Sequence, residues 1–268
     1  MITVKELQQQ IYQHFQELVD ETDKARSSDE MLQYLDCCAK FHTYSPNNIW
    51  LILLARPDAS YVAGFHKWKS MGRWVRKGER GIPIFAPLIH NGIDENDKEQ
   101  CSLFGFKIVH VFDVQQTDGE PLPPQPDWKS PAKSEELNLR LIEYAKSQGI
   151  SVTFKDLNGE VQGVSKGGVI EIDHSAGTKT FIHELAHELL HQGGSGLQSR
   201  ALRELEAESV AYVVAKHFHL PCLNCPKYLL LHGIDKEQLV EHMGRVQDTA
   251  SDVIQALEGE GQAHAIPA

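Results

Sequence analysis

Several features are scarce in this chain of 268 residues, and each scarcity argues against a class of protein. The five cysteines are an odd number in a long chain, which argues against the disulfide framework of small secreted domains. No run of eighteen or more apolar residues exists, so we expect no membrane span. The N-terminal stretch MITVKELQQQIYQHFQELVDE lacks the basic start and apolar centre of a signal peptide, and has the spacing of an amphipathic helix. We therefore expect a soluble, cytoplasmic protein without a membrane partner.

Proline is unevenly distributed along the chain. Five of the twelve prolines lie between residues 117 and 136, a stretch with almost no aliphatic residues. Proline at this density favours an extended linker. The sequence therefore predicts a first domain over residues 1–118, a linker over 119–134 and a second domain over 135–268.

Hydrophobic periodicity predicts an α+β protein. The first domain is expected to combine helices with an antiparallel sheet, and the second to be mainly helical with a small sheet. Ser134 is the expected N-cap of the first helix in the second domain, and Gly149 is expected just past its end. Helices are expected at 1–22, 28–42, 47–57, 134–149, 178–192, 198–218 and 235–258, and strands at 60–65, 73–78, 82–89, 106–114, 150–156 and 167–173.

The motif HELAH, His183 to His187, is typical of a zinc site. Two histidines four residues apart lie on one face of a helix, one turn apart, where both imidazoles can bind one Zn²⁺. Glu184 is then placed to act as the general base on a water molecule that the zinc acidifies. His191 continues this face, but ~12 Å of helix separates it from His183, so both cannot bind the same ion.

A third ligand is expected from the downstream helix, in LRELEAESVAYVVAKHF. Glu204 and Glu208 are four residues apart on one face, whereas Glu206 points elsewhere. We favour Glu204 as the ligand and Glu208 as the acceptor for the outer N–H of a liganding histidine. Glu206 or Glu208 as the ligand remains an alternative. The pair Cys222 and Cys225 is a lone CxxC, which does not predict a second zinc site.

Residues 56–80 form a basic, aromatic stretch in an otherwise acidic chain of net charge −11. Seven Lys and Arg residues face only two acidic ones, with aromatic rings between them. Cations that contact phosphates and rings that stack on bases are typical of single-stranded DNA binding. The alternative is that the tryptophans belong to the core. The candidate DNA-binding residues are Tyr61, Lys67, Trp68, Lys69, Arg73, Trp74, Arg76, Lys77 and Arg80.

Two stretches resemble a known family. Residues 44–118, with YSPNN, GFHKWKSMGRWVRKGERGIPIFAPLI and VFDVQQTDGEPLP, resemble the N-terminal domain of ArdC-type plasmid antirestriction proteins, which some conjugative primases share. The second half resembles the zincin-type metallopeptidase domain of that family through HELAH and the ExxAE of Glu204–Glu208. The resemblance implies single-stranded DNA binding and a gluzincin-type domain with His183, His187 and Glu204 as ligands and Glu184 as base. It also implies protection of plasmid DNA from restriction.

The resulting hypothesis is a DNA-tethered zinc peptidase that cleaves a protein or peptide of unknown identity, with a restriction endonuclease as a further candidate partner. The rival hypothesis is a non-catalytic antirestriction protein that binds DNA and in which the metal is structural.

Overall fold

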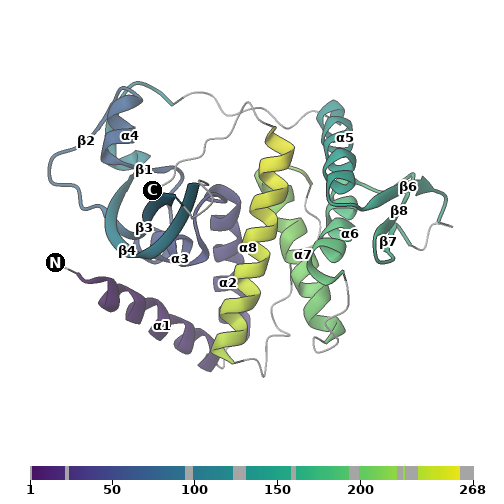
Figure 1. Ribbon diagram of the computed structural model, residues 1–268, viewed down its shortest axis with the longest axis horizontal. Coiled ribbons are helices and arrows are strands. Elements are labelled where there is room, and N and C mark those ends of the chain that lie inside the picture. Colours follow the sequence, from purple (N-terminus) through teal and green to yellow (C-terminus); the bar gives the residue numbers. More distant parts are fainter. Residues whose placement is uncertain are drawn as a thin grey trace. The chain divides into compact units, whose positions relative to one another are not determined.

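The computed structural model describes residues 2–21, 24–93, 99–122, 131–157, 161–192, 199–221, 226 and 235–259. Over these residues the chain is a mixed α/β protein (Figure 1) with two compact units. One unit is formed chiefly by Met1–His14 and Asn47–Pro124, and the other by Phe15–Pro46 and Gln125–Ala265. This division differs from the predicted boundary because helix α2 (Lys24–Lys40) packs against α7 (Arg200–His217). No helix in the described ranges is long and apolar enough to cross a membrane.

The first unit is built on an antiparallel sheet with strand order β1-β4-β3. The middle of helix α3, residues 48–53, is buried, with Ile49, Trp50 and Ile52 at 0% exposure, which explains its apolar sequence. The side chain of Asn48 pairs with the backbone of strand β3, accepting from Phe85 N at 2.8 Å and donating to Phe85 O at 2.9 Å. The elements of this unit are α3 (Pro46–Ala55), β1 (Val62–Gly64), α4 (Phe65–Ser70), β2 (Arg73–Val75), β3 (Ile82–Ile93), β4 (Glu99–Asp113), the 3₁₀ turn Val114–Gln116 and β5 (Thr117–Gly119).

Buried Asp113 explains the VFDVQQT run. Its carboxylate accepts hydrogen bonds from the backbone N–H groups of Ser60, Tyr61 and Gln115. The Gln116 side chain completes a capping box at the same turn. The run therefore positions β5, which pairs antiparallel with β2.

The second unit is mainly helical, with a three-stranded sheet beside α6 (Figure 1). Helix α7 is central, and most of its side chains from Leu205 to Ala215 are buried. In the sheet, β8 lies between β6, which is parallel to it, and β7, which is antiparallel and forms an edge. The remaining elements are α5 (Pro131–Ser147), β6 (Ser151–Lys155), β7 (Gly163–Ser165), β8 (Val169–Asp173), α6 (Thr178–His191) and α8 (Lys236–Glu258). Helix α1 (Val4–Asp20) spans the division between the units.

Most predicted elements are confirmed, but several differ from the prediction. The N-cap prediction for Ser134 is wrong: the helix already begins at Pro131, a residue whose fixed φ suits a first turn. The short helix α4 was not predicted, because six residues give too little periodicity. Strand β7 was not predicted; within residues 163–168, Gly167 and Gly168 have a positive φ, at 71° and 89°. Gly149 has a φ of 75° just past α5, as expected. Residues 123–130 of the predicted linker lie outside the described residues, and residues 131–134 belong to α5 rather than to a linker.

Candidate metal centre

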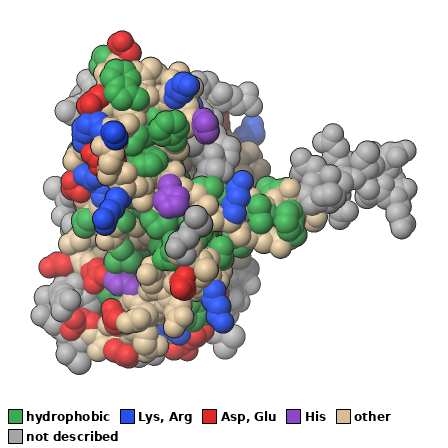
Figure 2. Space-filling view, turned by 90° about the vertical axis from the view of Figure 1, so that its left-hand side faces the viewer, with side chains coloured by type: hydrophobic (Ala, Val, Ile, Leu, Met, Phe, Trp, Pro, Cys, Tyr) green, Lys and Arg blue, Asp and Glu red, His purple; other side chains and the backbone are tan. Residues whose placement is uncertain are grey.

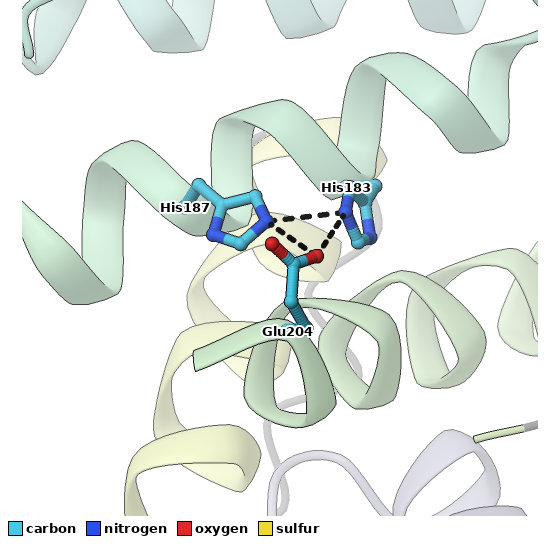
Figure 3. A group of neighbouring side chains, drawn as sticks. All are labelled: His183, His187 and Glu204. Atoms are coloured by element: carbon cyan, nitrogen blue, oxygen red, sulfur yellow. Dashed lines mark hydrogen bonds and ion pairs between the residues drawn. The ribbon is translucent and has the colours of Figure 1, made fainter. Parts of the chain in front are cut away.

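His183, His187 and Glu204 converge on one point (Figure 3). The two Nε2 atoms are 3.1 Å apart, and Glu204 Oε2 lies 3.6 Å from His183 Nε2 and 3.4 Å from His187 Nε2. Three ligands held tetrahedrally at ~2.0–2.2 Å from one ion stand about 3.3 Å from one another. The three distances bracket this value. The two imidazoles and the carboxylate therefore have the spacing and the chemistry to hold a divalent metal ion.

The convergence follows from the way α6 and α7 pack. The HELAH spacing aligns both imidazoles on one face of α6. Ala207 and Ala211, both fully buried, allow the backbone of α7 to come close. Ser199 caps α7, accepting from Leu202 N at 3.2 Å, so that Glu204 falls early in the helix.

Glu208 contacts the outer nitrogen of His183, as the sequence predicts for a residue that orients this ring. Its Oε2 lies 3.3 Å from His183 Nδ1, and its Oε1 accepts from Lys179 Nζ. Burial alone would lower the pKa of His183, but the contact with Glu208 and the negative charges of Glu184 and Glu204 together raise that pKa. Burial also opposes ionisation of Glu208, yet His183 and Lys179 lower its pKa overall. The pair holds the His183 ring in place.

Glu184 points to the edge strand β7. A Cβ placed on Gly163 would meet Glu184 Cγ at 2.6 Å, so only glycine leaves room for this side chain. Burial raises the pKa of Glu184, although neighbouring His183 partly opposes that rise. A raised pKa suits a carboxylate that has to accept a proton near neutral pH.

Glu188 is a further buried carboxylate that the sequence analysis did not identify. It is 1% exposed and accepts three hydrogen bonds, from Ser165 Oγ at 2.6 Å, Gly167 N at 2.8 Å and Gly168 N at 2.6 Å. These bonds tie the turn between β7 and β8 to α6. The available signal was its place one helical turn after Glu184, on the same face.

The metal group opens into a cleft of about 590 Å³. Residues of β7, α6 and α7 form its walls, so the two histidines, Glu184 and Glu204 all face one space. Its lining is Gly163, Val164, Ser165, Gly167, His183, Glu184, His187, Glu188, His191, Gln192, Arg200, Arg203 and Glu204.

Glu206 faces away from this group. It is fully buried, 3.3 Å from His242 Nδ1 and 3.4 Å from an Arg245 nitrogen. His191, the last residue of α6, lies 3.2 Å from Arg203 O and 3.6 Å from Glu206. Burial lowers the pKa of His191. Of the three glutamates considered, Glu204 is the one that joins both histidines.

Tyr212, His217 and His174 lie outside the cleft. The Tyr212 hydroxyl donates to Asp36, and His217 contacts Ala39 O and Glu258. His174 stacks on Phe154. The pair Cys222 and Cys225 lies outside the described residues.

The basic, aromatic stretch divides into core and surface residues. Trp68 is fully buried and donates to Phe112 O at 2.9 Å, so it presents no ring face to solvent. Arg73 binds Thr117, Gly119 and Glu120, which makes it part of the β2–β5 pairing. Trp74, by contrast, is 59% exposed.

The remaining candidates are mostly exposed. Lys67 and Lys69 lie on α4, and Lys77 and Arg80 on the turn after β2. Tyr61 is half-buried against Trp68, and Arg76 pairs with Glu79 and Asp118. Phe65, which was not among the predicted DNA-binding residues, is 51% exposed on α4. Figure 2 views the molecule from the left-hand side of Figure 1. In its upper part, where α4 and β2 lie, Lys and Arg side chains stand among hydrophobic ones.

Taken together, the chain is a mixed α/β protein with a His–His–Glu group suited to a divalent metal. It belongs to the ArdC antirestriction family: the family model of the N-terminal domain of anti-restriction factor ArdC matches residues 3–147.

Individual relatives are more distant. The chain is similar to the uncharacterized protein pXO2-81 of Bacillus anthracis, at 26% identity over 90% of this chain and 50% of that protein. It thus spans about half the length of this curated relative. Two crystal structures of the antirestriction ArdC protein from the R388 plasmid are also similar, each at 20% identity over 82% of this chain. The metal-free one is covered over 86% with a TM-score of 0.47, and the Mn(II)-bound one over 90% with a TM-score of 0.43.

Proposed function

We propose that this protein is a zinc-dependent peptidase that also binds single-stranded DNA. The observation that carries the peptidase part is the convergence of His183, His187 and Glu204 beside Glu184 in one cleft. When bound, a zinc ion would polarise a peptide carbonyl and acidify a water molecule. His183, His187 and Glu204 would hold this ion, and Glu208 would keep His183 oriented through its outer nitrogen.

Glu184 is the proposed general base. It would accept a proton from the attacking water and pass it to the leaving amine. Its raised pKa makes it a better proton acceptor than an ordinary glutamate. Gly163 keeps the position of this carboxylate free, because any larger residue would occupy the space of Glu184 Cγ.

Strand β7 offers a place for an extended peptide. It is the edge of its sheet and lines the cleft. Lys166 N donates to Val169 O within the sheet, so alternation along the strand turns the backbone groups of Gly163 and Ser165 outward. The Ser165 N–H already contacts the Glu184 carboxylate. An added strand could pair with the other outward backbone groups and place its carbonyl near Glu184.

The three-ligand group favours catalysis over a structural role. Structural zinc sites have four protein ligands, whereas catalytic sites keep one position open. Among the described residues, the group has three members, and Glu204 is half-exposed on the cleft side. The rival function, a DNA-binding antirestriction protein with a structural metal, lacks this support.

Two variants test the peptidase proposal. We expect His187→Ala to lose stoichiometric zinc, measured by inductively coupled plasma mass spectrometry, while His174→Ala, a substitution of an exposed histidine outside the cleft, keeps it. Glu184→Gln should keep zinc but lose cleavage of a mixed library of quenched fluorescent peptides. Equal cleavage by Glu184→Gln and the unmodified chain would refute the assignment of the base.

The DNA-binding part of the proposal rests on the exposed cations and rings of α4, β2 and the turn that follows. Lys69, Trp74 and Lys77 are exposed, and α4 packs against β2. Lysines there would contact phosphates, and Trp74 would stack on a base, a contact worth ~1–3 kcal/mol. Phe65 adds a second exposed ring to this set.

Binding of a fluorescent oligothymidine tests this surface. We expect Trp74→Ala to weaken binding about tenfold and Lys69→Ala/Lys77→Ala to flatten its salt dependence. Lys146→Ala, which removes an exposed cation from α5, is the matched control. Arg73→Ala is a poor test, because this side chain also holds β2 to β5. Unchanged affinity and salt slope in the first two variants would remove this surface from consideration.

Protection of plasmid DNA from restriction is the proposed biological role. If proteolysis underlies it, Glu184→Gln will fail to protect a transferred plasmid in a restricting host. Full protection by Glu184→Gln would instead favour the rival function, in which DNA binding alone protects.

A further inference from the structure

Two arginines of α7 line the cleft beside the metal group. Arg200 lies one helical turn before Glu204, and Arg203 directly precedes it. Arg200 is 88% exposed, and its Nε is 4.0 Å from Glu204 Oε1. Arg203 forms no ion pair within the parts of the chain that the structure describes. Both guanidinium groups therefore have hydrogen-bond donors to spare for a ligand in the cleft.

Apart from the 4.0 Å contact between Arg200 and Glu204, the carboxylates of the cleft are engaged with other groups. Glu188 already accepts three hydrogen bonds, and Glu204 faces the two histidines. Glu184 lies against Gly163 on the strand wall. Two arginines face three glutamates, so a bound divalent ion changes the formal charge of the lining from one negative to one positive. With a divalent ion bound, the cleft lining is thus cationic, although the net charge of the whole chain is −11.

We propose that Arg200 and Arg203 select peptides that carry a carboxylate close to the cleaved bond. This inference rests on the proposed peptidase function and names its substrate class. Guanidinium groups bind carboxylates through paired, charge-assisted hydrogen bonds. One helical turn is ~5.4 Å and one extended residue ~3.3 Å, so the selected carboxylate lies within about two residues of the bond.

This carboxylate can belong to an acidic side chain or to the C-terminus of the peptide. Both have the same chemistry, and four otherwise identical octapeptides distinguish them. The first has an internal Glu and an amidated C-terminus, the second an internal Gln and a free C-terminus, the third an internal Gln and an amide, and the fourth an internal Lys and an amide. Each carries an uncharged dye at its N-terminus.

Binding is measured by fluorescence anisotropy on the zinc-loaded Glu184→Gln chain, which is expected to bind without cleaving. At low salt we expect one of the two carboxylate peptides to bind about threefold to tenfold more tightly than the neutral one, and the lysine peptide to bind most weakly. Arg200→Gln and Arg203→Gln should each reduce this preference, and the double variant should abolish it. Lys146→Gln, the control cation outside the cleft, should keep it.

Equal binding of all four peptides, or a preference that survives in the double variant, would overturn the inference, as would binding of none. Circular dichroism melting of each variant confirms that the fold is intact. The outcome is separable from that of the peptidase proposal. A carboxylate preference without cleavage by the unmodified chain would keep the selective site and refute the enzyme, whereas cleavage without the preference would do the reverse.

Discussion

Removal of the Glu188 carboxylate is expected to loosen the strand wall of the cleft. Glu188→Ala leaves the Ser165 hydroxyl and the N–H groups of Gly167 and Gly168 without their acceptor. A buried donor that loses its partner costs about 1–3 kcal/mol. Because Glu188 lines the cleft, water can reach part of this network, and we take about 1 kcal/mol per bond. The expected loss is therefore about 2–4 kcal/mol, a large fraction of a typical stability of ~5–15 kcal/mol.

Urea unfolding followed by circular dichroism measures this loss. Glu188→Gln keeps the shape and one acceptor oxygen, so we expect it to lose about half as much as the alanine variant. Glu143→Gln, at an exposed position of α5, is the control and should stay within about 0.5 kcal/mol of the unmodified chain. If Glu188→Ala is as stable as this control, the three hydrogen bonds do not hold β7 to α6, and the reasoning fails.

Three further outcomes are expected. Gly163→Ala should displace Glu184, since its Cβ would lie 2.6 Å from Glu184 Cγ, and reduce peptide cleavage up to about 100-fold with unchanged zinc content. Trp68→Ala should lower the free energy of unfolding by about 3–5 kcal/mol and Trp74→Ala by less than about 1 kcal/mol in the same urea assay, since only Trp68 is buried. Hydrogen bonds from Ser175 and Leu157 lower the pKa of Asp173 from 3.8 to about 2. The ionised carboxylate therefore stabilises the folded protein fully above pH ~4, and this contribution is lost as the pH falls through about 2. Asp173→Asn should flatten this pH dependence, measured as urea midpoints between pH 2 and 5.

The metal group could be predicted because helical periodicity fixes it locally. The spacing of His183 and His187 places both rings on one face, and the position of Glu206 relative to Glu204 turns it away from them. Only the choice of α7 as the partner helix needed inference beyond one helix, and the two glutamates four residues apart on one face of α7 indicated that choice. Most helices and strands were predicted for the same reason.

The remaining features depend on contacts between distant segments. Nothing local distinguishes Trp68 from Trp74, since burial is decided by how β4 covers α4. The role of Glu188 depends on the approach of β7 to α6, and that of Arg203 on the shape of the cleft. Likewise, the packing of α2 against α7 joins residues far apart in the chain, and the proline-rich stretch carries no signal for it.

The pairing of Asn48 with Phe85 has a consequence for the resistance of this sheet edge to aggregation. Strand β3 is the edge of its sheet, and its outward N–H positions fall on every second residue. Residues 83 and 87 on that row are prolines, which have no N–H to offer, and the amide between them is occupied by the Asn48 side chain. Three consecutive N–H positions of this edge strand therefore cannot donate to a strand of another molecule, which disfavours edge-to-edge aggregation.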